Sequence, residues 1–159
     1  MIVAGCDLSY TRSAIVWMDE GFVVQKSSAF AIAPGPFRLK RALYAFNRIL
    51  TSANDLPPPS LCVIEDNAYG APSRVVVVKL AALNTLLKVV CECWDVDWLE
   101  VSPSALKKGI TGKGNAEKAQ VAQELLRLYG IKFDNDKGFD LSDAAAAAVW
   151  GVKHRLEGK

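Results

Sequence analysis

The chain has 159 residues, about the size of one domain, and 51% of them are hydrophobic, which is enough for one buried core. Its apolar runs, such as 75–78 and 144–150, are far shorter than the roughly 20 residues that a membrane-spanning helix needs, so we expect no membrane span. The formal net charge is only +2, so overall charge neither indicates nor excludes a nucleic-acid partner.

The N-terminal residues and the cysteines favour a cytoplasmic protein. No basic region precedes an apolar stretch, as it would in a signal peptide. None of the four cysteines forms the Cys-x-x-Cys pair of zinc and redox sites. We therefore expect free thiols in a reducing compartment at Cys6, Cys62, Cys91 and Cys93.

Three strands are predicted in the first 30 residues, over 2–7, 13–18 and 22–27. The first is mostly apolar and ends on Asp7, and Asp19-Glu20-Gly21 between the other two is typical of a hairpin turn. Gly35-Pro36 then precedes a predicted helix that runs to about residue 52. Its apolar positions keep helical spacing at Leu39, Leu43, Phe46 and Leu50, and its arginines form a basic stripe on another side at Arg38, Arg41 and Arg48.

The middle of the chain predicts two strands around a long helix. Residues 61–65 form a short apolar strand that again ends on an acid, Glu65. The helix over about 74–92 is apolar on most sides, so it must be buried widely, inside the fold or against a partner. A further apolar strand is predicted over 96–101.

The last third predicts three helices. Pro103 favours a short helix to about Lys108, followed by a loop over 109–114. Asn115 is expected to cap a helix over 116–129, which Gly130 ends. Asp140 is expected to cap an alanine-rich helix over 141–156.

A β-β-β meander followed by alternating helices and strands predicts an α/β fold in a single domain over residues 1–159. The expected architecture is a five-stranded mixed β-sheet flanked by helices on both faces. This pattern suits an RNase H-like fold.

Four acids stand where they could converge on metal ions. Asp7 and Glu65 end predicted strands, and they emerge at one sheet edge if those strands are parallel neighbours. Asp140 and Asp143 lie three residues apart at a helix start and share a face. Mg²⁺ prefers oxygen ligands, and a two-ion site can activate a water and stabilise a leaving oxygen. Taken singly, each acid is more simply explained as a turn, edge or helix-cap residue, so only the combination indicates a site.

The charged residues are unevenly distributed. Residues 102–118 carry four lysines against one acid, and residues 134–143 carry four aspartates against one lysine. A basic loop beside an acidic cluster suits an enzyme that holds phosphates near metal ions. Solvated surface charge can produce the same pattern.

Four motifs, in the same order, resemble the RuvC family of Holliday-junction resolvases. The most specific is the stretch V-S-P-S-A-L-K-K-G-I-T-G-K-G-N-A-E-K-A-Q-V over residues 101–121. The segments I-V-A-G-C-D and C-V-I-E-D-N resemble the two acidic strands of the family, and F-D-L-S-D-A-A-A-A-A resembles its terminal helix. The first motif usually continues D-P-G, whereas this sequence has Asp7-Leu8-Ser9.

The resemblance implies a metal-dependent, structure-selective endonuclease that resolves four-way DNA junctions by paired symmetric nicks, leaving 5′-phosphate and 3′-hydroxyl ends. It implies that two Mg²⁺ ions, which Mn²⁺ can replace, are bound by Asp7, Glu65, Asp140 and Asp143. It also implies that Lys107 and Lys118 lie at the catalytic site, where a lysine can hold or polarise the scissile phosphate. For Lys118 the alternative is a solvated partner of Glu117 or Glu124.

Three further residues are candidate DNA contacts. Lys108 and Lys113 belong to the lysine-rich segment, and Lys113 lies between two glycines in a loop that can approach a DNA backbone closely. Tyr69 lies where the family places an aromatic residue near the junction centre. It could stack on an unpaired base or simply pack in a turn.

A four-way junction has two strands to cut symmetrically, which matches a two-fold homodimer. The apolar helix over 74–92 is the expected dimer surface. Two other functions stay open: an RNase H-like nuclease acting on other branched DNA or RNA–DNA hybrids, and a catalytically weak junction-binding protein.

Overall fold

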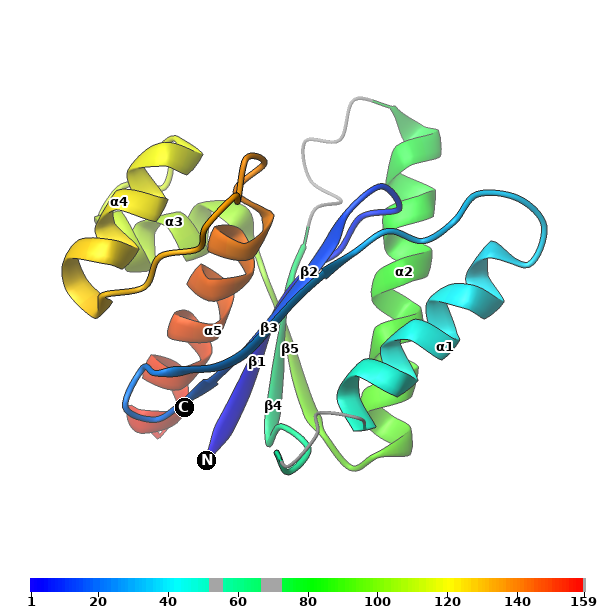
Figure 1. Ribbon diagram of the computed structural model, residues 1–159, viewed down its shortest axis with the longest axis horizontal. Coiled ribbons are helices and arrows are strands. Elements are labelled where there is room, and N and C mark those ends of the chain that lie inside the picture. The colour runs from blue at the N-terminus through cyan, green and yellow to red at the C-terminus, as the bar shows by residue number, and fades with distance from the viewer. Residues whose placement is uncertain (52–55, 67–72, 159) are drawn as a thin grey trace.

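The computed structural model describes residues 1–51, 56–66 and 73–158, which form a central sheet with helices on both faces (Figure 1). The strands are β1 (Ile2–Asp7), β2 (Ser13–Asp19), β3 (Val24–Phe30), β4 (Leu61–Glu65) and β5 (Asp97–Val101). The helices are α1 (Arg38–Thr51), α2 (Arg74–Cys93), α3 (Pro103–Thr111), α4 (Lys118–Tyr129) and α5 (Asp140–Leu156).

The sheet has five strands in the order β3-β2-β1-β4-β5. The first three strands of the chain pair antiparallel, while β4 lies parallel to β1 and β5 lies parallel to β4. Helices α3, α4 and α5 lie on one face and α1 and α2 on the other (Figure 1). The predicted five-stranded mixed sheet with helices on both faces is therefore confirmed.

Each central strand contributes to two hydrophobic cores, one on each face of the sheet. In β4, for example, Val63 packs in the core beneath α3, α4 and α5, whereas Cys62 and Ile64 pack in the core beneath α1 and α2. Since both faces are covered, these strands read as continuous apolar runs rather than as alternating ones. This is why β1 and β4 have the bounds that the sequence predicts.

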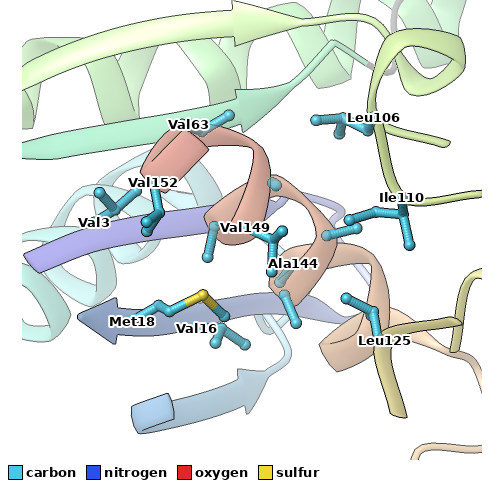
Figure 2. Close-up of a cluster of buried hydrophobic side chains, with 14 of the residues drawn as sticks. Val3, Val16, Met18, Val63, Leu106, Ile110, Leu125, Ala144, Val149 and Val152 are labelled. Atoms are coloured by element: carbon cyan, nitrogen blue, oxygen red, sulfur yellow. The ribbon is translucent and has the colours of Figure 1, made fainter. Parts of the chain in front are cut away.

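Helix α5 packs very closely on β1 and β4 because small residues line the contact (Figure 2). Residues 144–148 are all alanine and all buried. A Cβ atom on Gly5 would lie 2.0 Å from the Ala144 carbonyl oxygen, and one on Gly151 would lie 2.5 Å from the Val63 side chain. The alanine-rich sequence of α5 is therefore explained by a close helix–sheet approach.

Several predicted helix ends are wrong, because the residues that cap these helices are not the ones that the sequence predicts. Helix α3 runs past Lys108 to Thr111, where Gly112 adopts the left-handed conformation. The next helix starts at Lys118 rather than 116, because Glu117 and Gln120 form a capping box and Asn115 does not cap it. Gly130 ends that helix as predicted.

The start of α5 also differs from the prediction. Asp140 is the first residue of the helix and does not cap it. Instead, the carboxylate of Asp136 accepts hydrogen bonds from the backbone N–H groups of Leu141 and Ser142, at 3.2 and 2.9 Å. Asp136 therefore satisfies the first turn, and Asp140 is left for another role.

The hairpin turn after β2 is confirmed, but β3 begins at Val24 rather than at residue 22. The Asp19 carboxylate accepts hydrogen bonds from the backbone of Gly21 and Val23, and Phe22 has a positive φ of 62°. The turn is therefore wider than the sequence pattern indicates.

Helices α1 and α2 are each only partly buried within the fold. In α1, Phe46 and Leu50 are buried, but Leu39 and Leu43 are 46% and 38% exposed. In α2, one face packs inside the fold while several valines of the other face remain exposed, at Val75, Val78 and Val89. Across the described ranges no helix has the length and apolarity to cross a membrane.

Two of the three arginines in the predicted basic stripe of α1 are hydrogen-bonded within the fold. The Arg38 guanidinium donates to the backbone carbonyls of Tyr10 and Ile32, and Arg41 donates to those of Ala33 and Pro34. These two arginines therefore fix the segment before the helix. The four cysteines are free thiols, as predicted.

Candidate active site

The parallel pairing of β1 and β4 brings the first two carboxylates together. Cys6 and Ile64 are register partners, so the next residues, Asp7 and Glu65, leave the sheet side by side at the same edge. The residues just before them, Cys6 and Ile64, pack in the core beneath α1 and α2. Because side chains alternate along a strand, Asp7 and Glu65 themselves face α5. The condition on which the sequence prediction depended, that these strands are parallel neighbours, is met.

The third carboxylate comes from α5. Asp143 lies in the first turn of this helix and is only 8% exposed. Its side chain accepts a short hydrogen bond from the ammonium group of Lys118, with which it forms an ion pair. The close approach of α5 to β1 at Gly5 places this turn over the sheet edge that carries Asp7.

The α3–α4 pair supplies two lysines to the same place. A cavity of about 170 Å³ is lined by three acids, two bases and a few apolar side chains. The charged residues are Asp7, Glu65, Asp143, Lys107 and Lys118. Five of the six predicted catalytic residues therefore surround one cavity.

The carboxylates of this cavity repel one another. The pKa of Glu65 is raised to about 8 by burial and by the negative charges of Asp7 and Asp143, which the two lysines only partly offset. Burial likewise raises the pKa of Asp143, against the opposing effect of Lys118. Burial acts to lower the pKa of Lys118, but its hydrogen bond to Asp143 and the nearby carboxylates raise it overall.

The donor set fits a divalent cation. Hard ions such as Mg²⁺ take carboxylate oxygens. Burial raises the pKa of Glu65 most, and the neighbouring charges of Asp7 and Asp143 raise it further, so a cation would favour its ionised form. As the side chains stand in the described residues, no three acidic, histidine or cysteine groups form a ready metal cluster. Instead, Lys118 holds the Asp143 carboxylate, and its ammonium provides positive charge in the cavity.

The fourth predicted ligand lies outside this cavity. The Asp140 carboxylate forms an ion pair with Arg12, whose Nε lies 2.9 Å from Oδ2, and Asp140 is not among the residues that line the cavity. Its charge nevertheless acts on Asp143, whose pKa it helps to raise. Asp140 is therefore a neighbour of the cavity, held by a residue that the sequence analysis did not single out.

Two of the three further DNA-contact candidates, Lys108 and Lys113, do not line the cavity. Lys108 and Lys113 are exposed, near the end of α3 and in the loop that follows it. Tyr69 lies outside the described residues. The exposed lysines are therefore available at the surface next to the element that carries Lys107.

A larger hollow, of about 630 Å³, is lined by other residues, among them Asp97, Trp98 and His154. Asp97 begins β5, whereas Glu65 ends the parallel strand beside it, so the two cavities lie at opposite ends of the sheet. Two acids of this hollow are already bonded, Asp97 to Arg155 and Glu92 to the Trp98 indole. The larger volume of this hollow therefore does not make it the active site. The converging charged side chains identify the smaller cavity as the candidate.

Comparison with protein families gives one match over most of the chain. Residues 10–151 match the family model for the crossover junction endodeoxyribonuclease RuvC. The match begins three residues after Asp7, so this first acid is placed by the sheet geometry rather than by the family model.

Curated relatives carry the same family description. The chain is 33% identical over 90 residues to RuvC of Oleidesulfovibrio alaskensis, which covers 57% of this chain and 53% of that protein. It is 28% identical over 126 residues to RuvC of Chloroherpeton thalassium, which covers 76% and 64%. The chain thus spans about half to two thirds of the length of these relatives.

Solved structures share the fold over nearly the whole chain. Thermus thermophilus RuvC has a TM-score of 0.80 at 20% identity, with 99% of this chain and 97% of that chain covered. The yeast mitochondrial Holliday junction resolvase Ydc2 has a TM-score of 0.66 at 14% identity, with 98% and 82% covered. This likeness confirms the predicted RNase H-like fold.

Proposed function

Since the chain belongs to the RuvC family of crossover junction endodeoxyribonucleases, we propose that it is a structure-selective endonuclease that resolves four-way DNA junctions by paired symmetric nicks. The observation that carries the proposal is the single cavity lined by Asp7, Glu65 and Asp143 together with two lysines. A Thermus thermophilus RuvC of the same fold, with a TM-score of 0.81, has been solved in complex with a Holliday junction substrate. We further propose that it acts on DNA in the cytoplasm of a bacterial or phage-infected cell.

The RuvC family consists of divalent-metal-dependent nucleases, and we propose two Mg²⁺ ions for this chain, with Mn²⁺ able to replace them. Asp7, Glu65 and Asp143 would hold the ions, with Asp140 as a further ligand beside the cavity. Bound ions supply an activated water and stabilise the leaving oxygen of a phosphodiester, which yields 5′-phosphate and 3′-hydroxyl ends.

The chain's own groups have separate tasks in this scheme. Lys107 and Lys118 carry positive charge into the cavity, where they bind the scissile phosphate and stabilise charge that develops on it. Glu65 holds a proton near neutral pH while the cavity lacks cations, and it must lose that proton to act as a ligand. Release of Asp143 from Lys118 would free both groups for their roles.

The surface around the cavity would hold the junction. Lys108 and Lys113 are exposed beside the catalytic lysines and would contact the DNA backbone, and Tyr69 would stack on a base near the junction centre. We propose a homodimer that pairs through the exposed apolar side chains of α1 and α2, so that two cavities act on opposite strands.

The test is cleavage by Asp7→Asn, with Asp134→Asn, an exposed aspartate, as the matched control. We expect wild type and control to nick a synthetic four-way junction symmetrically in Mg²⁺. Asp7→Asn should lose at least about a hundredfold in rate, because a proposed ion ligand would lose its charge, yet bind the junction in a gel-shift assay. Full activity of this variant would refute the proposed site.

A substrate panel separates the competing functions. Wild type is given the four-way junction, a flap, an RNA–DNA hybrid and a linear duplex of the same sequence. Preferential cutting of the flap or the hybrid would favour a different RNase H-like nuclease. Junction binding without cleavage in either Mg²⁺ or Mn²⁺ would favour a junction-binding protein.

A further inference from the structure

The carboxylate of Asp140 is not needed to cap the helix that it begins. Asp136 accepts hydrogen bonds from the backbone N–H groups of Leu141 and Ser142, and its Oδ2 also accepts one from the Ser142 hydroxyl at 2.8 Å. Asp140 is nonetheless largely buried, with its side chain 18% exposed. Its position therefore calls for an explanation other than helix capping.

Two residues lie close to this carboxylate. Arg12 donates through Nε to Oδ2 of Asp140 at 2.9 Å, which leaves Oδ1 for another partner. Gly138 is the second: a Cβ atom on it would lie 2.8 Å from the same oxygen, Oδ2, and 3.3 Å from Cγ. Gly138 does not adopt the left-handed backbone, and a side chain there would displace the Asp140 carboxylate from its present position.

Arg12 is itself held by the turn that follows Asp7. The Ser9 hydroxyl accepts a hydrogen bond from the Arg12 backbone N–H at 2.9 Å and donates to the Arg12 carbonyl at 3.0 Å. The buried Ser13 hydroxyl accepts from the Ser9 N–H and donates to the Ser9 carbonyl, at 3.1 and 2.6 Å. The turn therefore connects the strand that carries Asp7 to the helix that carries Asp140 and Asp143.

From these contacts we infer that Arg12, with the space left by Gly138, is a positioning residue that orients the Asp140 carboxylate toward the ion site. The inference rests on the proposed function, since it assigns a task within the same metal site. Ser9 occupies the position at which the family usually has glycine. Its hydroxyl forms hydrogen bonds that hold the Arg12 backbone in the turn.

The direction in which metal affinity changes when Arg12 is replaced shows whether Arg12 positions Asp140 or acts only through its positive charge. Removing a cation beside a metal site should by itself strengthen binding of another cation, since the repulsion between them disappears. Loss of an orienting partner should weaken binding, and such partners typically change metal affinity by about 10–100-fold. Because Arg12 is 44% exposed, its ion pair contributes little to the stability of the fold, so the variants should fold.

The experiment measures Mn²⁺ binding to the DNA-free protein by the loss of the free-ion electron paramagnetic resonance signal. We expect Arg12→Met to raise the dissociation constant about tenfold. Arg12→Lys should restore part of the affinity, and Gly138→Ala should weaken binding in the same direction. The matched control is Arg127→Met, which removes an exposed arginine paired with Glu124.

A double-mutant comparison tests whether Arg12 acts through Asp140. In an Asp140→Asn background, Arg12→Met should cause no further loss of Mn²⁺ affinity. An additive loss, or wild-type or tighter binding by Arg12→Met, would overturn the inference. If circular dichroism shows that Arg12→Met does not fold, the Mn²⁺ affinities of Gly138→Ala and Arg12→Lys, measured by the same titration, test the inference instead. If the wild type binds Mn²⁺ and cuts junctions and these variants do the same, only this inference is refuted. If the wild type does not bind Mn²⁺, the proposed metal site is overturned as well.

Discussion

Glu65 is a carboxyl group whose charge depends on what the cavity holds. Without a cation, burial and the charges of Asp7 and Asp143 raise its pKa to about 8, so it is largely protonated at neutral pH. A bound cation would favour the ionised form by removing the repulsion. Protonation of Glu65 therefore reduces the repulsion among the carboxylates, and its ionisation would supply a further ligand when a cation binds.

This pKa shift determines the contribution of Glu65 to the pH dependence of folding stability in the metal-free protein. A carboxyl whose pKa rises from 4.5 to about 8 on folding gives a contribution that is present below pH 4.5 and lost as pH rises through about 8. In EDTA, we expect the melting temperature of wild type to fall between pH 5 and pH 8.5. Glu65→Gln should show a shallower fall by differential scanning fluorimetry, because it carries no proton to lose.

The control for this titration is Asp134→Asn, which removes an exposed acid and should follow the wild-type curve. Equal slopes for wild type and Glu65→Gln would contradict the assigned cause. Excess Mn²⁺ should reduce the fall in wild type, because bound cations stabilise the ionised carboxylates and bind only the folded protein.

Among the elements, α5 connects the fold to the site most directly. Its alanines allow it to approach β1 so closely that Gly5 has no room for a side chain, and its first turn carries Asp143 and Asp140. The same helix covers the hydrophobic core on this face of the sheet (Figure 2). Packing and site geometry are therefore set by one contact.

We expect Gly5→Ala to impair both stability and cleavage. The added Cβ atom would lie 2.3 Å from the Ala148 backbone nitrogen, so α5 must move away from β1. Such overpacking typically costs about 1–3 kcal/mol, and it shifts Asp143 relative to Asp7. The free energy of unfolding is measured in urea, and cleavage in Mg²⁺ at a temperature where the variant is folded.

Gly21→Ala is the matched glycine control, since its Cβ would meet only the Asp19 carboxylate, at 3.3 Å, in an exposed turn. It should change stability by less than about 0.5 kcal/mol and leave cleavage unchanged. If Gly5→Ala were as stable and active as this control, the close helix–sheet contact would not be what sets the site.

The sequence predicts the elements better than their ends, for a physical reason. Strands β1 and β4 follow from short apolar runs that close on Asp7 and Glu65, and their pairing brings those acids together as expected. Helix ends depend on which side chain reaches the first turn. Asp136 caps α5 from outside it, and Glu117 rather than Asn115 starts α4.

The same limit applies to the site. Lysines at 107 and 118 belong to a recognisable motif, and the structure places both at the cavity. The ion pair between Arg12 and Asp140 joins residues from opposite ends of the chain. No local pattern at Arg12 marks it, so only the fold could reveal this contact.

At the scale of the whole molecule, more of the exposed large apolar side chains lie on α1 and α2 than on α4 and α5, among the described residues. On the side of α1 and α2, apolar side chains remain exposed, including Leu43, Val78 and Val89 at 38%, 67% and 47%. Exposed apolar groups that share one surface are a common mark of a protein interface. A two-fold dimer through this surface would pair two cavities for the two strands of a junction.

The last prediction tests this pairing by placing a charge on the proposed interface. We expect wild type to have about twice the 17.2 kDa chain mass by size-exclusion chromatography with light scattering at micromolar protein, and Val78→Lys to be a monomer. Two-fold symmetry would bring two added lysines, one from each subunit, into the same interface, and their desolvation and repulsion oppose association.

Monomers should still carry the carboxylate cavity, because Val78 lies on α2 and not at the site. We therefore expect Val78→Lys to bind Mn²⁺ normally but to lose paired nicking, so that a cruciform plasmid yields nicked circles rather than linear DNA. Val23→Lys, which changes a valine that is 56% exposed in the turn before β3, should remain dimeric and produce linear DNA. A wild-type monomer that nicks both strands together would rule out the dimer and place the coupling of the two cuts elsewhere.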